Sequence, residues 1–239
     1  MVKTFYSIII WPIWYAFFLP SLLFLLFVII IFPRKHLFYF IRPICWVYCF
    51  LAGQWLKKVN HPPSKHGGPY LYMFNHVSMF DQFMIGAYIP HYVTAVAAIE
   101  IFKYPIWGYI IKKYGVIPII RQKIRKAIGS LNLAEKAIKD GTSFLISPEG
   151  TRTTTGEIGP FKKGPFHLAK NTKVTIVPIG LIGGFKAKKK NDWRINPGVL
   201  TIVFGKPIHS NEYQELNIEE LQNLVLKRII ALKQDRGYR

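Results

Sequence analysis

Acidic residues and cysteines are scarce in this sequence, and both shortages limit what the protein can be. There are 12 Asp and Glu against 32 Lys and Arg, which gives a formal net charge of +20. This imbalance indicates a polyanionic partner, namely nucleic acid, anionic lipid or a phosphorylated substrate. The two cysteines, Cys45 and Cys49, are too few for a disulfide framework. Neither the cysteines nor the histidines show metal-site spacing, so no metal is expected.

Charge is also absent from a long stretch near the N-terminus. No charged residue occurs from Thr4 to Phe32, and this apolar run exceeds the roughly 20 residues that span a bilayer. A second apolar stretch, Leu37 to Leu56, is rich in aromatic residues but contains Arg42, which favours a membrane-embedded or interfacial helix. A cleaved signal peptide is disfavoured, because the run is too long and a basic segment, 34–36, follows it instead of a cleavage site.

Basic residues flank the second apolar stretch, and they indicate the orientation of the chain in a membrane. Lys and Arg favour the cytoplasmic side, so we expect everything downstream of this stretch to lie on the cytoplasmic face. Lys3 is a single opposing residue. The membrane-flanking basic residues are Arg34, Lys35, Arg42, Lys57 and Lys58.

The chain divides into an apolar part and a larger α/β part. We expect a hydrophobic helical membrane anchor over residues 1–56, a Pro- and Gly-containing linker over 57–69, and a catalytic domain over 70–239. In the last part β-rich runs alternate with helical patterns, which predicts an α/β domain with a largely parallel sheet flanked by helices. The expected strands are 70–74, 92–99, 115–119, 143–147, 174–180 and 200–204, and the expected helices are 79–88, 105–113, 121–139, 165–170 and 218–234.

A histidine and a carboxylate follow the first strand of this domain. His76 and Asp81 are five residues apart, so they would not share a face of one regular helix. They can meet if His76 lies in the turn and Asp81 in the first turn of the following helix. Ser78 supports this placement, since Ser-x-x-Asp resembles a capping box. The carboxylate would then hold the imidazole in one tautomer and leave the other nitrogen free to accept a proton.

Further blocks follow in order, and together they resemble a known family. After Asn-His-x4-Asp come Pro-Glu-Gly-Thr-Arg at 148–152, Pro-Phe-Lys-Lys-Gly at 160–164 and Val-Pro-Ile at 177–179. This order resembles the glycerolipid acyltransferases, and is most similar to the 1-acylglycerol-3-phosphate O-acyltransferases, over roughly 69–208. The resemblance implies that His76 is a general base held by Asp81, and that it deprotonates a glycerol hydroxyl that attacks an acyl thioester. No enzyme nucleophile is then needed, and the sequence contains no Gly-x-Ser-x-Gly elbow.

The Glu-Gly-Thr-Arg block is implied to bind the phosphate of the acceptor. Gly150 would let the backbone approach an anion, while Thr151 offers a hydroxyl and Arg152 a bidentate fork. Glu149 would hold Arg152 or hydrogen-bond the acceptor. Lys162 and Lys163 are candidate contacts to phosphate or to the membrane surface, and simple solvation accounts for them equally well.

The segment 100–121 resembles the family's second block with departures. Ala98 and Ile99 stand where the family commonly has lysine, and Ile120 stands where it often has aspartate. Arg121 is retained at a strand end and is a candidate second phosphate contact, or else the first charge of a basic helix. The departures bear on the acceptor headgroup more than on the chemistry.

These observations predict a membrane-associated transfer of a fatty acyl group from acyl-CoA or an acyl carrier protein to 1-acylglycerol 3-phosphate, forming phosphatidate. No cofactor is expected, because the thioester supplies its own activation. One alternative is an acyltransferase for glycerol 3-phosphate, another lysophospholipid or a lyso-aminolipid. The other is a membrane-tethered module that binds polyanions without catalysis. Nucleic acid is disfavoured as a partner, because no nucleic-acid-binding motif is present.

Overall fold

The fold is built on a mostly parallel sheet, in a computed structural model that describes residues 2–120 and 124–234. The sheet has seven strands in the order β1-β7-β6-β2-β5-β3-β4. Neighbouring strands are parallel except β6 and β7, which are antiparallel. The predicted α/β class with a largely parallel sheet is confirmed. The strands are β1 (Gln54–Val59), β2 (Tyr70–Phe74), β3 (Val93–Ala98), β4 (Ile117–Ile119), β5 (Ser143–Ile146), β6 (Thr175–Ile182) and β7 (Gly198–Phe204).

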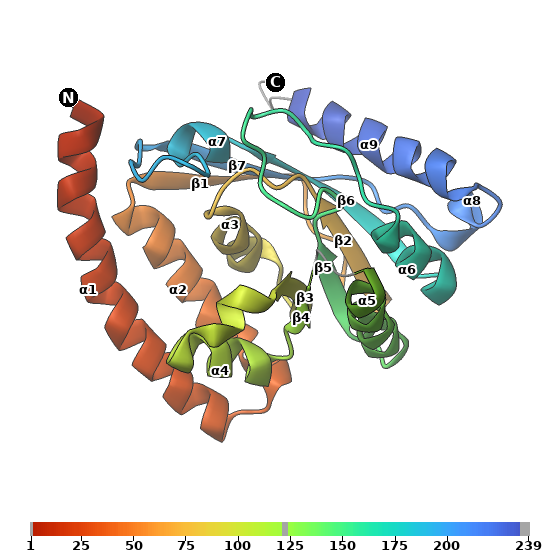
Figure 1. The fold of residues 1–239 in the computed structure, drawn as a ribbon, viewed down its shortest axis with the longest axis horizontal. Coiled ribbons are helices and arrows are strands. Elements are labelled where there is room, and N and C mark those ends of the chain that lie inside the picture. Colours follow the sequence, from red (N-terminus) through yellow and green to blue (C-terminus); the bar gives the residue numbers. More distant parts are fainter. Residues whose placement is uncertain (1, 121–123, 235–239) are drawn as a thin grey trace.

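Helices cover both faces of the sheet. Figure 1 shows α1, α2 and α3 on one side and α5, α6 and α9 on the other, in agreement with two separate clusters of buried apolar side chains. The helices are α1 (Val2–Ile31), α2 (Phe38–Leu51), α3 (Asp81–Tyr88), α4 (Pro105–Tyr114), α5 (Ile124–Lys139), α6 (Gly164–Thr172), α7 (Gly184–Ala187), α8 (Ser210–Tyr213) and α9 (Ile218–Gln234).

The central strand β2 shows why the sheet needs helices on both faces. Successive side chains of a strand point to opposite faces. Tyr70 and Tyr72 accordingly pack in the cluster beneath α2 and α3, whereas Leu71 and Met73 pack in the cluster beneath α6 and α9. All four are buried, so the strand is a continuous apolar run without polar alternation. The carboxyl end of this strand leads directly into the turn that carries His76.

The N-terminal helices belong to the core as well as presenting an apolar surface. Trp14 of α1 and Cys45, Tyr48 and Cys49 of α2 are buried in the cluster that they share with the sheet. In the described part of the chain, α1 is the one helix that is long and apolar enough to cross a membrane, and 22% of its most apolar window is buried. Its exposed apolar side chains include Phe5, Ile8, Ile13, Leu19, Leu23, Phe27 and Ile30.

The boundary expected at residue 56 falls inside a strand. Residues 54–59 form β1, which pairs in parallel with β7 from Gln54 opposite Gly198 to Val59 opposite Val203. The first residues of the expected linker therefore belong to the sheet. The sequence did not reveal this strand, because its apolar residues continue those of α2 and its lysines look like the start of a polar linker. Gln54 is buried, and its amide donates to the carbonyl oxygens of Ala52 and Asn196.

Candidate active site

Loops that follow three neighbouring strands form the site. The chain leaves β2 through the turn 75–80, leaves β5 through the loop 147–163, and leaves β6 through α7 and the segment 188–197. β2 lies between β5 and β6, and both pairings are parallel, so the three carboxyl ends meet at one edge. Active sites of such sheets lie outside these ends.

His76 and Asp81 meet as the sequence predicted. His76 lies in the turn and Asp81 is the first residue of α3, and the His76 Nδ1 atom is 2.6 Å from Asp81 Oδ2. The carboxylate is 1% exposed and the imidazole 27% exposed. Because the carboxylate oxygen only accepts, Nδ1 carries the hydrogen, and Nε2 is the nitrogen left to accept a proton. The pair thus presents a partly exposed imidazole that is held by a buried carboxylate.

Backbone amides hold the Asp81 carboxylate in place. Oδ2 also accepts hydrogen bonds from the backbone N–H groups of Val77, at 2.7 Å, and Ser78, at 3.0 Å. The position at the N-terminus of α3 favours its negative charge. The capping role expected for Ser78 is wrong: Phe80 precedes the helix, and the Ser78 hydroxyl donates to the carbonyl oxygen of Lys188 at 3.0 Å. The hydroxyl is directed across to the neighbouring loop because that loop packs directly on the turn.

Two residues beside the turn were not recognised as structural supports from the sequence. The Asn75 side chain donates to the Leu181 carbonyl and accepts from the Leu181 N–H, at 3.0 and 2.7 Å, so it continues the β2–β6 pairing beyond the end of β2. Gly184 packs against the turn so closely that a Cβ atom there would lie 2.9 Å from Val77 Cγ2 and 3.0 Å from Ser78 Cβ. Both contacts join segments distant in sequence, although the adjacent glycines at 183–184 were a visible signal.

Glu149 has a role that the sequence did not predict. Its Oε1 accepts a hydrogen bond from the His76 backbone N–H at 2.7 Å, and its Oε2 accepts one from the Gly159 N–H at 2.8 Å. The side chain is 6% exposed, and burial raises the pKa of this carboxyl while the two N–H donors oppose the rise. Glu149 therefore joins the loop after β5 to the turn that carries His76. Among the described residues it forms no ion pair with Arg152, which was one of the two roles considered for it.

Replacing Glu149 by glutamine is expected to destabilise this junction. An amide has one accepting oxygen, so one of the two backbone N–H groups would face the amide NH₂ group. Leaving a buried donor unpaired costs about 1–3 kcal/mol, which should appear as a lower free energy of unfolding in urea. Glu157→Gln, an exposed change in the same loop, is the matched control. Equal unfolding free energies for the two variants would contradict this account.

The rest of the Glu-Gly-Thr-Arg block lies beside His76. Gly150 has a φ of 69°, which favours glycine, and its N–H donates to the Ser147 carbonyl within a tight turn. The Thr153 N–H donates to the His76 carbonyl at 2.8 Å, so the half-buried Arg152 is held next to the turn that carries His76. The exposed Thr151 accepts a hydrogen bond from Lys190 Nζ at 3.0 Å.

The remaining candidate residues occupy different places. The stem of Lys162 lies over Gly150, since a Cβ atom on that glycine would be 3.7 Å from Lys162 Cγ. Lys163 instead forms an exposed ion pair with Glu219 of α9, at 3.0 Å, which favours the solvated alternative for its side chain. Arg121 lies outside the described residues. In residues 2–120 and 124–234 no group of His, Cys, Asp and Glu is arranged to hold a metal ion.

Comparison with known proteins assigns the chain to a family. The sequence model of the Acyltransferase family matches residues 56–182, and the chain belongs to this family. Its curated relatives include the 1-acyl-sn-glycerol-3-phosphate acyltransferase of Cocos nucifera, 35% identical over 156 residues, which are 65% of this chain and 51% of the relative. The protein of that name from Saccharomyces cerevisiae is 31% identical over 173 residues, 71% of this chain and 57% of the relative. The chain thus spans about half the length of the curated relatives that it matches.

A solved structure shares the whole fold. The crystal structure of the 1-acyl-sn-glycerophosphate (LPA) acyltransferase PlsC from Thermotoga maritima superposes with a TM-score of 0.81 and covers 100% of this chain and 96% of that one. The sequences are 21% identical, so this likeness concerns the fold. It extends over the N-terminal helices as well as the sheet, in agreement with their burial in a common core.

Proposed function

We propose that this protein transfers a fatty acyl group from an acyl thioester to the free hydroxyl of 1-acylglycerol 3-phosphate and so forms phosphatidate. The observation that carries the proposal is the 2.6 Å contact between His76 and the buried Asp81, with Arg152 held beside the same turn through the Thr153–His76 hydrogen bond. The names of the curated relatives support this acceptor.

The proposed reaction uses the free nitrogen of His76. Nε2 takes the proton of the acceptor hydroxyl as that oxygen attacks the thioester carbonyl carbon. A C–O bond forms, the C–S bond breaks, and the departing thiolate receives the proton from the imidazolium. Asp81 stabilises the imidazolium and keeps Nδ1 as the donor. The donor is acyl-CoA or an acyl carrier protein, and no cofactor is invoked because the thioester is already activated.

Membrane association follows from the substrate and from α1. A lysophospholipid and its product stay in the bilayer, and removing their chains into water would cost about 0.8 kcal/mol for each methylene. The exposed apolar side chains of α1 and of Trp46 and Phe50 of α2 offer a surface that lipid can cover. The basic residues after α1 are the basis for placing the site on the cytoplasmic face, where anionic lipid would attract the net charge of +20.

A thiol-release assay tests this function. Purified protein is supplied with acyl-CoA or acyl carrier protein, and with lysophosphatidate, glycerol 3-phosphate, lysophosphatidylcholine or a lyso-aminolipid. Release that requires lysophosphatidate supports the proposal. Release with another acceptor alone supports the alternative acyltransferase. Nucleic-acid binding without thiol release would support the non-catalytic module.

Replacing Arg152 by alanine should weaken use of the acceptor more than use of the donor. A charge-assisted hydrogen bond in a partly buried site contributes about 1.5–3 kcal/mol, which corresponds to about 10–100-fold in kcat/KM for lysophosphatidate. Arg228→Ala, an exposed change on α9, serves as the control. If the constants of donor and acceptor change equally in Arg152→Ala, Arg152 does not bind the acceptor phosphate.

A further inference from the structure

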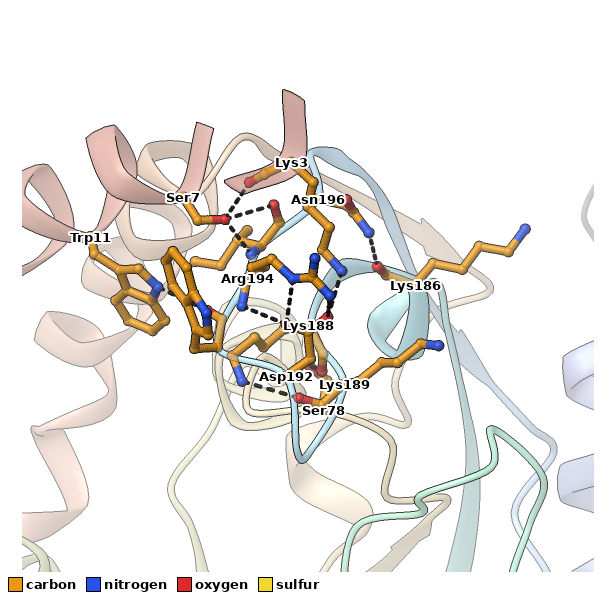
Figure 2. A network of polar contacts seen from close by, with 12 residues as sticks. Lys3, Ser7, Trp11, Ser78, Lys186, Lys188, Lys189, Asp192, Arg194 and Asn196 are labelled. Atoms are coloured by element: carbon orange, nitrogen blue, oxygen red, sulfur yellow. Dashed lines mark hydrogen bonds and ion pairs between the residues drawn. The ribbon is translucent and has the colours of Figure 1, made fainter. Parts of the chain in front are cut away.

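Lys188 is buried, although it belongs to the basic run Lys-Ala-Lys-Lys-Lys at 186–190. Its exposure is 7%, and its Nζ atom donates to the Lys189 carbonyl at 3.0 Å. Figure 2 shows that the side chains of Lys186 and Lys189 extend away from the network, whereas Lys188 lies within it. A lysine is rarely buried to this degree unless it is paired. Lys188 is therefore distinct from the other lysines of the loop.

The loop that carries Lys188 is fixed to the catalytic turn and to α1. The Lys188 carbonyl accepts the hydrogen bond of Ser78, three residues before Asp81. Farther along, Ser7 of α1 accepts a hydrogen bond from the Ile195 N–H at 2.8 Å, and Trp11 donates to the Trp193 carbonyl at 2.9 Å (Figure 2). The backbone of the loop is thus held at Lys188 by the turn that carries His76, and at Trp193 and Ile195 by α1.

Positive charges accumulate where this loop meets the Glu-Gly-Thr-Arg block. Burial lowers the pKa of the Lys188 ammonium, and the charge of Arg152 lowers it further, while Asp192 opposes both effects. Asp192 is itself engaged by Lys3 at 3.0 Å and by Arg194 at 2.9 Å. Lys190 donates to Thr151 at 3.0 Å. In the part of the chain that the structure describes, no carboxylate forms an ion pair with Lys188 or Arg152.

We propose that Lys188 and Lys190 complete, together with Arg152 and Thr151, a site for the phosphomonoester of the acceptor. A phosphate bound there would supply the anionic partner for these cations. It would lie beside His76, where the acceptor hydroxyl must be. Several cations around one anion favour a dianionic phosphomonoester over a singly charged phosphodiester. This inference rests on the proposed function. It assigns the selectivity of the enzyme for the acceptor headgroup to a loop that follows the last of the family's sequence blocks, Val-Pro-Ile at 177–179.

Binding and kinetics of Lys188→Gln and Lys190→Gln test the site, with Lys189→Gln as the matched control from the same loop. Calorimetric titration without acyl donor would use two water-soluble probes, 1-hexanoyl-lysophosphatidate and 1-hexanoyl-lysophosphatidylcholine. We expect the Lys188 and Lys190 variants to bind the phosphomonoester about tenfold or more weakly, and Lys189→Gln to match the parent protein. The acceptor KM should rise by a similar factor, with the donor KM little changed.

The outcomes separate this inference from the proposed function. Equal phosphomonoester affinity in Lys188→Gln, Lys190→Gln and Lys189→Gln would overturn the site, even if the parent protein is an active lysophosphatidate acyltransferase. Absence of thiol release by the parent protein with every lysolipid would overturn the function, while the titration still reports on the anion site. Thermal unfolding identifies variants that do not fold. If Lys188→Gln is one of them, the variant Lys190→Gln, at a half-buried position, decides the test.

Discussion

Replacing His76 by alanine is expected to reduce acyl transfer by about 10²–10⁴-fold, the usual contribution of a general base. The turn should survive, because Asp81 keeps its hydrogen bonds from the N–H groups of Val77 and Ser78, and the Glu149 contact uses the backbone of residue 76. The loss would therefore come from the missing Nε2 atom and not from unfolding. Single-turnover thiol release, together with thermal unfolding, measures both quantities.

His167→Ala is the control for this experiment, since His167 is an exposed histidine on α6. Its turnover should equal that of the parent protein. Near-parental turnover in folded His76→Ala protein would remove His76 as the base and, with it, the mechanism built on the His–Asp pair.

Replacing Asp81 by asparagine should lower acyl transfer by about 10²–10⁴-fold while leaving the backbone of the turn in place. Oδ2 is the oxygen that accepts from His76, Val77 and Ser78, and Oδ1 is buried without a partner among the described residues. If the asparagine oxygen occupies the Oδ2 position, the three hydrogen bonds persist but the charge that stabilises the imidazolium is lost. In the reverse orientation the NH₂ group faces Nδ1, which selects the tautomer whose Nε2 carries the hydrogen.

The measurements for Asp81→Asn are the value of kcat and its dependence on pH. The pH dependence is needed because a changed tautomer and a lost charge both act through the imidazole of His76. Asp140→Asn, an exposed change after α5, controls for the loss of one negative charge from a protein with few acids. A folded Asp81→Asn variant with the turnover of Asp140→Asn would show that Asp81 has no role in catalysis.

Local sequence signals predicted the elements around the site well. The apolar run 70–74 is β2, and the change from strand to helix between Phe74 and Asp81 placed His76 in the turn. These features depend on neighbours in the chain, which a single sequence contains. The largely parallel sheet flanked by helices also follows from the alternation of strands and helices.

Long-range contacts are what the sequence could not provide. Glu149 bonds to the backbone of His76, and a backbone partner has no sequence signature of its own. Lys188 looks like its neighbours in a basic run, but it is buried and directly follows α7, which packs against the turn that carries His76. Arg152 was predicted as a cation of the site, but Lys190, which donates to the adjacent Thr151, belongs to a loop about forty residues later. That loop is held by Ser7 of α1 through Ile195.

The pairing of β1 with β7 has a consequence for how the chain is made. β1 is an edge strand whose partner is β7. The backbone of Trp55 can therefore pair only after Val199, which lies opposite it in β7, has been synthesised. Contacts between such distant segments form slowly, and a chain is synthesised at about 5–20 residues per second. The apolar helices α1 and α2 would leave the ribosome well before β7 exists, while the sheet is still incomplete. A stalled nascent chain ending at residue 197 would then hold β1 unpaired, and closure of the sheet by β7 would be the late event that joins β1 to the other strands.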